Sequence, residues 1–168
     1  MDVAVVVGNP RSGGRTTTVA EAVATQLTHA VPGSHTTTTY ELSELTDELF
    51  DWHSERVAAA NAAVRSADLA IFASPTYKAS FTGLLKVFLD RYPSDGLSGL
   101  VAVPVMLGAG RMHQLAIETQ LRPVLVELAA IVPTKGLFVV DSELDGLDQA
   151  IDDWWGTAAD PLQRLLTQ

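Results

Sequence analysis

The stretch VAVVVGNPRSGGRTTTVAEAVATQL, residues 3–27, decides the fold. It opens with five consecutive valine and alanine residues, 3–7, a pattern typical of a short strand buried on both faces. A turn rich in glycine, serine and proline starts at Gly8, and an amphipathic helical pattern begins near Thr16. A strand, a glycine-rich turn and a helix N-terminus in that order predict an anion site, because unpaired backbone amides and the positive helix end converge on one point.

Charged and hydroxyl side chains strengthen this interpretation of the turn. Arg11 and Arg15 bring positive charge, and Thr16 and Thr17 bring hydroxyl groups that donate hydrogen bonds. The alternative is an ordinary strand-to-helix turn, in which the glycines provide tight geometry and Thr16 or Ser12 caps the helix. The coincidence of two arginines with two glycines favours the phosphate site.

The turn departs from two well-known phosphate loops. A Walker A loop, G-x-x-x-x-G-K-[ST], has lysine where this chain has Arg15, and Asn9 stands where its first glycine belongs. The dinucleotide fingerprint G-x-G-x-x-G fails because Gly8 is followed by Asn9 and then Pro10. A P-loop nucleotide hydrolase, with LFVVD at 137–141 imitating a Walker B strand, is therefore the least favoured alternative.

Composition limits the class of protein. A chain of 168 residues with 47% hydrophobic residues is expected to form a single domain, 1–168, with a sizeable core. The net charge of −9 argues against binding to nucleic acid or to anionic membranes. The chain has no cysteine, which excludes disulfides and iron–sulfur clusters. It also shows neither a signal-peptide pattern nor an apolar run of about 18 residues, so we expect a cytoplasmic protein.

Strand and helix patterns alternate along the chain. The expected strands cover residues 3–7, 35–40, 68–73, 100–107 and 136–140, and the expected helices cover 16–29, 55–66, 82–91, 112–129 and 145–166. Residues 41–51 are expected to form an acidic loop, and Pro104 is unfavourable within a fully paired strand. The alternation predicts an α/β fold, with a parallel sheet and helices on both faces. The arrangement we expect is a flavodoxin-like three-layer sandwich, whose five-stranded parallel sheet has the order 2-1-3-4-5.

Three loops follow the first, third and fourth strands, at 8–16, 74–81 and 108–113, and this order makes them neighbours at one edge of the sheet. In the second loop, backbone amides, a hydroxyl and the ring of Tyr77 suit a planar heterocycle. The sequence is equally compatible with the alternative that Tyr77 only packs against the protein and Lys78 is only a solvated surface charge. The small residues of the third loop let a backbone approach a flat ligand closely. A phosphate at one end and a flat polar ring at the other describe flavin mononucleotide (FMN).

The chain offers no candidate catalytic side chain. The four histidines lack the spacing of metal ligands, and no serine lies in a G-x-S-x-G context. His113 suits a helix N-terminus or a subunit interface better than a catalytic role. Hydride transfer through a cofactor depends on positioning more than on ionisable side chains, which fits this absence.

Three blocks of the sequence resemble the NAD(P)H-dependent FMN reductases of flavodoxin-like fold, and most closely the flavin-reductase components of two-component sulfonate monooxygenase systems. GNPRSGGRTT at 8–17 resembles the family's G-S-P-R-x-x-S-R-[ST]-[ST] phosphate loop. SPTYKASFTGLLKVFLD at 74–90 follows its [ST]-P-x-Y-K-A-S-[FY]-[ST]-G-x-L-K-x-x-L-D block closely. LGAGRMHQLAIETQLRPVLVELAA at 107–130 resembles its G-G-x-x-x-H-x-L-A-x-[DE]-x-x-L-[KR]-P-V-L-x-x-L block.

The resemblance implies roles for individual residues. It assigns phosphate contacts to the arginines and threonines of the first loop, flavin-ring and ribityl contacts to the second loop and ring-edge contacts to the third. Asn9 and Gly14 stand where the family pattern has serines, and Ala109 replaces the second glycine of a pair. The expected cofactor-binding residues are Asn9, Arg11, Gly14, Arg15, Thr16, Thr17, Pro75, Thr76, Tyr77, Lys78, Gly108, Ala109 and Gly110.

The resemblance also implies an activity and partners. We expect hydride transfer from NADH or NADPH to FMN, release of reduced flavin to a partner monooxygenase, and a homodimer or homotetramer with the helices after the second and third loops at its interface. One alternative keeps FMN as a prosthetic group and reduces quinones, azo dyes or metal ions. Another, a flavodoxin-like electron carrier without nicotinamide turnover, suits the acidic charge.

Overall fold

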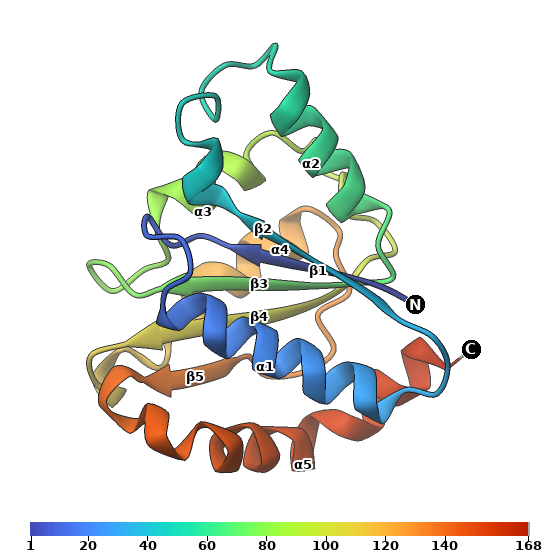
Figure 1. The fold of residues 1–168 in the computed structure, drawn as a ribbon, viewed down its shortest axis with the longest axis vertical. Coiled ribbons are helices and arrows are strands. Elements are labelled where there is room, and N and C mark those ends of the chain that lie inside the picture. The colour runs from blue at the N-terminus through green and yellow to red at the C-terminus, as the bar shows by residue number, and fades with distance from the viewer. Residues whose placement is uncertain (168) are drawn as a thin grey trace.

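Five parallel strands form one sheet in the computed structural model, which describes residues 1–167. The strands are β1 (Asp2–Val7), β2 (Thr36–Glu41), β3 (Leu69–Pro75), β4 (Val101–Gly108) and β5 (Leu137–Val140). Their order is β2-β1-β3-β4-β5, and every neighbouring pair is parallel (Figure 1). The predicted sheet order is confirmed.

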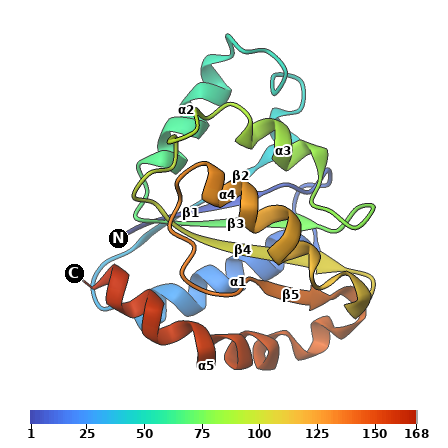
Figure 2. The ribbon, with the colours of Figure 1, turned by 180° about the vertical axis from the view of Figure 1, so that it is seen from behind.

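Helices cover both faces of the sheet (Figures 1 and 2). One face carries α1 (Arg15–Ala30) and α5 (Leu147–Leu166), and the other carries α2 (Glu55–Arg65), α3 (Gly83–Leu89) and α4 (Arg122–Glu127). Alternate residues of each strand point to opposite faces, so apolar residues at every position of the central strands supply both cores. In β1, Val5 packs toward α1 and Val6 toward the opposite face.

Pro104 lies inside β4, between two partner strands, and pairs with Phe72 of β3. Its missing N–H faces β5, because the amide of Ala102, two residues earlier, donates on that side to the carbonyl of Ile131. Pairing with β5 begins only at Val105. The proline therefore falls in the gap between the bridge at Ile131 and the start of β5, where no donor is needed.

The regular helix expected over residues 112–129 is wrong in its geometry. A 3₁₀ turn at Arg111–His113 comes first, a π-helix at Ile117–Leu121 follows, and only α4 is a regular α-helix. A π turn holds one extra residue, so the apolar positions before and after it no longer share a face. Leu115 is consequently 66% exposed, whereas Leu121 and Leu125 are buried.

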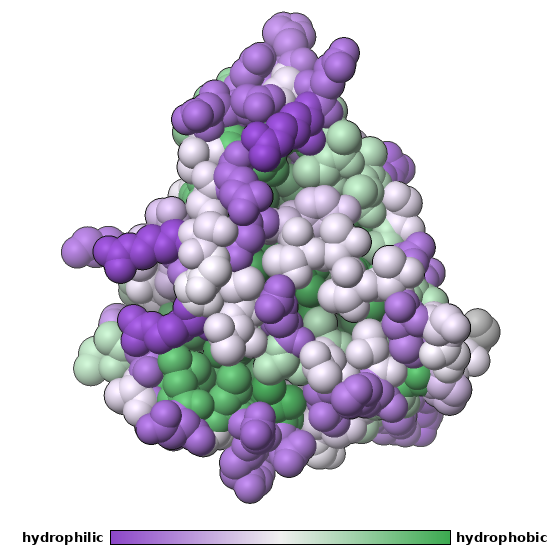
Figure 3. Space-filling view, in the orientation of Figure 1, coloured by the Kyte–Doolittle hydropathy of each residue, from purple (hydrophilic) through white to green (hydrophobic). Residues whose placement is uncertain are grey.

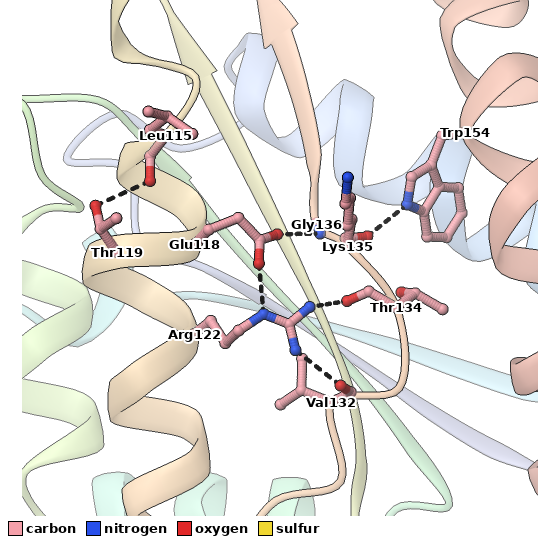
Figure 4. Close-up of polar contacts among 9 residues, drawn as sticks. All are labelled: Leu115, Glu118, Thr119, Arg122, Val132, Thr134, Lys135, Gly136 and Trp154. Carbon is pink, nitrogen blue, oxygen red and sulfur yellow. Dashed lines mark hydrogen bonds and ion pairs between the residues drawn. The ribbon is translucent and has the colours of Figure 1, made fainter.

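A clamp of hydrogen bonds holds the π-helix against the segment that leads into β5 (Figure 4). The guanidinium of Arg122 donates to Glu118 Oε2 at 2.6 Å and to the carbonyl oxygens of Val132, at 2.8 Å, and Thr134. Glu118 Oε1 accepts from the amide of Gly136 at 2.8 Å. Glu118 and Arg122, four residues apart, lie on one side of the helix, where they fix the entry of β5 into the sheet.

Residues 41–51, expected to form a loop, contain the 3₁₀ helix Leu42–Leu45. Leu42, Leu45 and Leu49 recur every three or four residues and are buried, so the segment is packed against the sheet although it is acidic. It leads into the tip at the top of Figure 1, whose surface is largely hydrophilic (Figure 3). The loop expectation failed because the acidic residues concealed this helical spacing.

Candidate cofactor site

The loops after β1, β3 and β4 meet at the carboxyl edge of the sheet, on the left of Figure 1. Hydrophilic side chains protrude at the same edge in Figure 3. Hydrogen bonds join the loops: Thr82 Oγ1 donates to the carbonyl of Gly8, and the amide of Thr76 donates to the carbonyl of Leu107 at 2.6 Å. The structure therefore brings the three predicted loops together.

The first loop packs tightly on the start of α3. A Cβ atom at Gly8 would lie 2.6 Å from the Cβ of Leu85, so only glycine allows this approach. Thr82 caps α3 by accepting from the amide of Leu85 at 3.2 Å, and Ser74 Oγ accepts from the amide of Thr82 at 3.0 Å. The sequence interpretation missed both hydroxyls as organisers of the site. The threonine before the apolar run of α3 was the available signal, since it is a common capping pattern.

Asn9 and Gly14, the two departures from the family's phosphate loop, explain each other. Asn9 Nδ2 donates to Thr16 Oγ1 at 3.2 Å, and Asn9 Oδ1 accepts from the amide of Arg11 at 3.1 Å. A Cβ atom at Gly14 would lie 3.0 Å from Asn9 Nδ2. The asparagine side chain therefore fits across the loop because residue 14 has no side chain.

The cap of α1 differs from the one weighed in the sequence. The N-cap is Gly14, which has no side chain to cap the helix. The expectation that Thr16 or Ser12 caps the helix is therefore wrong. Thr16 is instead buried inside the first turn, and Ser12 Oγ donates to Glu44 Oε1 at 3.3 Å. An N-terminus without a capping side chain leaves its amides to bind an anion, as the phosphate interpretation requires.

The two arginines of this region differ in what they contact. The guanidinium of Arg11 is exposed and has no hydrogen bond or ion pair within residues 1–167. The guanidinium of Arg15 lies 3.8 Å from Asp141, the residue that follows β5. Arg11 is thus the cation with its hydrogen-bonding capacity free for a phosphate, whereas Arg15 shares its charge with a carboxylate.

Glu41, the last residue of β2, reaches into the first loop. It lies beside Val7, because the parallel strands β1 and β2 pair these two residues. Glu41 Oε1 accepts from the amide of Gly13 at 3.0 Å and from Thr17 Oγ1 at 2.6 Å. Nothing in the local sequence signals this contact, since only the order of the strands places the end of β2 at the loop.

The second loop contains a strained turn. Tyr77 and Ser80 exchange two backbone hydrogen bonds, of 2.8 and 3.1 Å, around Lys78 and Ala79. These two residues have φ angles of 51° and 62°, a left-handed conformation usually filled by Asn-Gly. Such strain costs about 1 kcal/mol per residue and is typical of ligand-binding positions. The ring of Tyr77 is 52% exposed, which favours ligand contact over plain packing.

The third loop lies against the start of the second. A Cβ atom at Gly108 would lie 2.7 Å from Phe138 Cζ and 3.2 Å from Thr76 Oγ1, so glycine is needed there. Thr76 Oγ1 is itself buried and has no hydrogen-bond partner. Of the neighbouring expected residues, Ala109 is exposed, and Pro75 and Gly110 are half-buried. An unpaired hydroxyl at one end and an uncapped helix with a free arginine at the other fit a planar ligand that carries a phosphate.

Comparison with known proteins identifies the family. The family model described as NADPH-dependent FMN reductase matches residues 1–145. The chain belongs to this family. The match includes all three blocks of the sequence resemblance and every expected cofactor-binding residue, so the predicted family is confirmed.

Individual relatives agree with this assignment. An FMN reductase (NADPH) of Pseudomonas putida is 40% identical over 81 residues, which make up 48% of this chain and 41% of the relative. The chain thus spans about two fifths of that relative. The NADH-dependent FMN reductase SfnE of Pseudomonas putida is 31% identical over 153 residues, or 86% of this chain and 79% of the relative. The apo form of the NADH:FMN oxidoreductase EMOB superimposes with a TM-score of 0.79 at 28% identity, covering 97% of this chain and 93% of that one.

Proposed function

We propose that this protein is an NAD(P)H-dependent FMN reductase that supplies reduced flavin to a partner monooxygenase. The observation that carries the proposal is the meeting of three loops at one sheet edge, with a phosphate-type helix N-terminus at one end and a strained aromatic loop at the other. FMN would supply the redox chemistry, because its ring accepts a hydride from a nicotinamide.

The chain's own residues would bind and orient the flavin. Arg11 and the amides at the start of α1 are placed to hold its phosphate, and Thr76 and Tyr77 are placed to line its ring. Gly108 allows Phe138 and Thr76 to pack closely against the third loop, where the edge of the ring would lie. No proton donor or acceptor is assigned, because a hydride passed between two stacked rings depends on their distance and orientation.

A second copy of the chain is part of the proposal. Several apolar side chains between the third loop and the end of α4 are exposed, namely Met112 at 86%, Leu115 at 66% and Val126 at 55%. Exposed apolar side chains grouped in one segment are typical of an interface. They support a homodimer or homotetramer in which this segment is covered. Light scattering after size-exclusion chromatography measures the mass of the oligomer.

The decisive experiment is a flavin titration followed by steady-state NAD(P)H oxidation on the same sample. Weak FMN binding, with turnover that saturates in added FMN, is the expected result for a reductase of diffusible flavin. Tight binding with turnover only after a quinone or dye is added would assign a prosthetic-flavin reductase instead. Binding without any nicotinamide oxidation would indicate an electron carrier, and absence of both would refute the proposed function.

Within residues 1–167, no helix is long and apolar enough to cross a membrane.

A further inference from the structure

The phosphate loop of this chain is already occupied by a carboxylate. Glu41 Oε1 takes the amide hydrogen of Gly13 and the hydroxyl hydrogen of Thr17, and its second oxygen, Oε2, is buried without a partner. Glu44, from the same segment, accepts from Ser12 Oγ. The end of β2 and the 3₁₀ helix that follows it therefore supply two negative charges to a loop whose backbone is arranged for an anion.

These carboxylates take hydrogen bonds that a phosphate would need. A hydroxyl has one hydrogen, so Thr17 cannot donate to Glu41 and to a phosphate at once, and the same holds for the amide of Gly13. A phosphate monoester carries nearly two negative charges at neutral pH, and a like charge in the same site opposes its binding. Arg15 compensates little, because its guanidinium is paired with Asp141.

We infer that Glu41 acts as a built-in competitor of the FMN phosphate, which weakens flavin affinity and keeps the flavin exchangeable. This inference rests on the proposed function and explains how a chain with an FMN-type loop could release its product to another enzyme. Flavin binding then requires Glu41 to give up Thr17 and Gly13, and flavin release restores both hydrogen bonds.

The test compares two flavins that differ only in the phosphate. Glu41→Gln removes the charge and keeps an oxygen able to accept from Thr17 and Gly13, so the loop keeps its shape. We expect the FMN dissociation constant, measured by quenching of flavin fluorescence, to fall by about tenfold or more. The dissociation constant of riboflavin, which has no phosphate, is expected to stay within about twofold, because the ring contacts are unchanged.

Glu21→Gln is the matched control. Glu21 lies on α1, and its Oε1 accepts from Thr39 Oγ1 at 3.0 Å, so the variant makes the same change in net charge on the same pair of elements. Its FMN affinity should equal that of the wild type. Glu44→Gln is expected to have a smaller effect than Glu41→Gln, since its contact with Ser12 is longer and exposed.

Each outcome decides between defined alternatives. FMN binding that is unchanged or weaker in Glu41→Gln, in a folded variant that still binds riboflavin, would show that Glu41 only braces the loop and would overturn the inference alone. An equal gain in Glu21→Gln would also overturn it, because net charge would then be the cause. Failure of the wild type to bind either flavin would overturn the proposed function, and the inference with it.

Discussion

The hydroxyl of Thr82 lies 2.5 Å from the carbonyl oxygen of Gly8, although the two residues are 74 positions apart. The same hydroxyl accepts from the amide of Leu85 and so begins α3. One buried oxygen thereby joins the loop after β1 to the helix that follows the loop after β3. The spacing between the two ends of the site depends on this link.

Replacement of Thr82 by valine should destabilise the protein by about 2–3 kcal/mol. The substitution keeps the shape but leaves the buried carbonyl of Gly8 unpaired and α3 uncapped. Urea unfolding measures the change. Thr82→Ser retains both hydrogen bonds and should lose less than half as much. A loss in Thr82→Ser as large as that in Thr82→Val would show that the methyl group, which valine keeps, contributes as much as the hydroxyl.

Arg11→Gln should raise the FMN dissociation constant about three- to tenfold and leave that of riboflavin unchanged. The free guanidinium of Arg11 lies in the loop proposed to hold the phosphate, so a contact with the flavin ring is not expected. Arg15→Gln should have a smaller effect because Arg15 is shared with Asp141. Arg65→Gln, at an exposed position of α2, is the control with the same change in charge. A rise in the dissociation constants of both FMN and riboflavin in Arg11→Gln would contradict the assignment.

Ala79→Gly should stabilise the protein by about 1 kcal/mol, because glycine adopts a φ of 62° without steric cost. Ala129, with a φ of 64° after α4, should respond in the same way. Ala58→Gly in the middle of α2 serves as the control and should destabilise by about 0.5–1 kcal/mol. Chemical denaturation of the three variants distinguishes relief of strain from a general effect of glycine.

Arg122→Met should destabilise the protein by about 2 kcal/mol or more, since it leaves Glu118 and two backbone carbonyls without their partner. Arg122→Lys keeps the charge but lacks the planar fork, and its loss should be intermediate. Lys86→Met breaks an exposed ion pair with Asp90 and should change the unfolding free energy by less than about 0.5 kcal/mol. A similar loss for Lys86→Met would argue against the clamp.

Stability should fall above about pH 10 because of Tyr92. Burial raises the pKa of Tyr92 above its ordinary value of 10.0, and its hydrogen bond to Asn61 offsets only part of this shift. The folded chain therefore keeps a proton that the unfolded chain loses, so this contribution is complete below pH 10 and disappears as the pH rises. Urea unfolding at several alkaline pH values should show a shallower decline for Tyr92→Phe, while Tyr77→Phe on the exposed loop should follow the wild type.

The sheet was predictable because its determinants are local. Continuous apolar runs such as 3–7 and 69–73 identify buried strands, and their alternation with helical patterns indicates a parallel sheet. The same reasoning placed the three loops at one edge, which required no knowledge of side-chain contacts.

The polar details of the site were not predictable, because they depend on contacts between distant residues. Glu41 looked like part of an acidic loop, and only the pairing of β2 with β1 brings it to Gly13 and Thr17. The π-helix was missed for a related reason. The spacing of its leucines fits a regular helix, and the clamp from Arg122 to residues 132–134 that accompanies the wider turn is invisible in the local pattern.

Pro104 also restricts the register of the last strand. A slip of β5 by two residues toward the start of β4 would keep Leu137 and Val139 on the same face, so hydrophobic patterning alone would not prevent it. The slipped strand would, however, require a hydrogen-bond donor from Pro104, and proline has none. The residue that looked unfavourable for a central strand therefore excludes one alternative alignment of β5. That alignment would move the place where the chain leaves the sheet, at Asp141 beside Arg15.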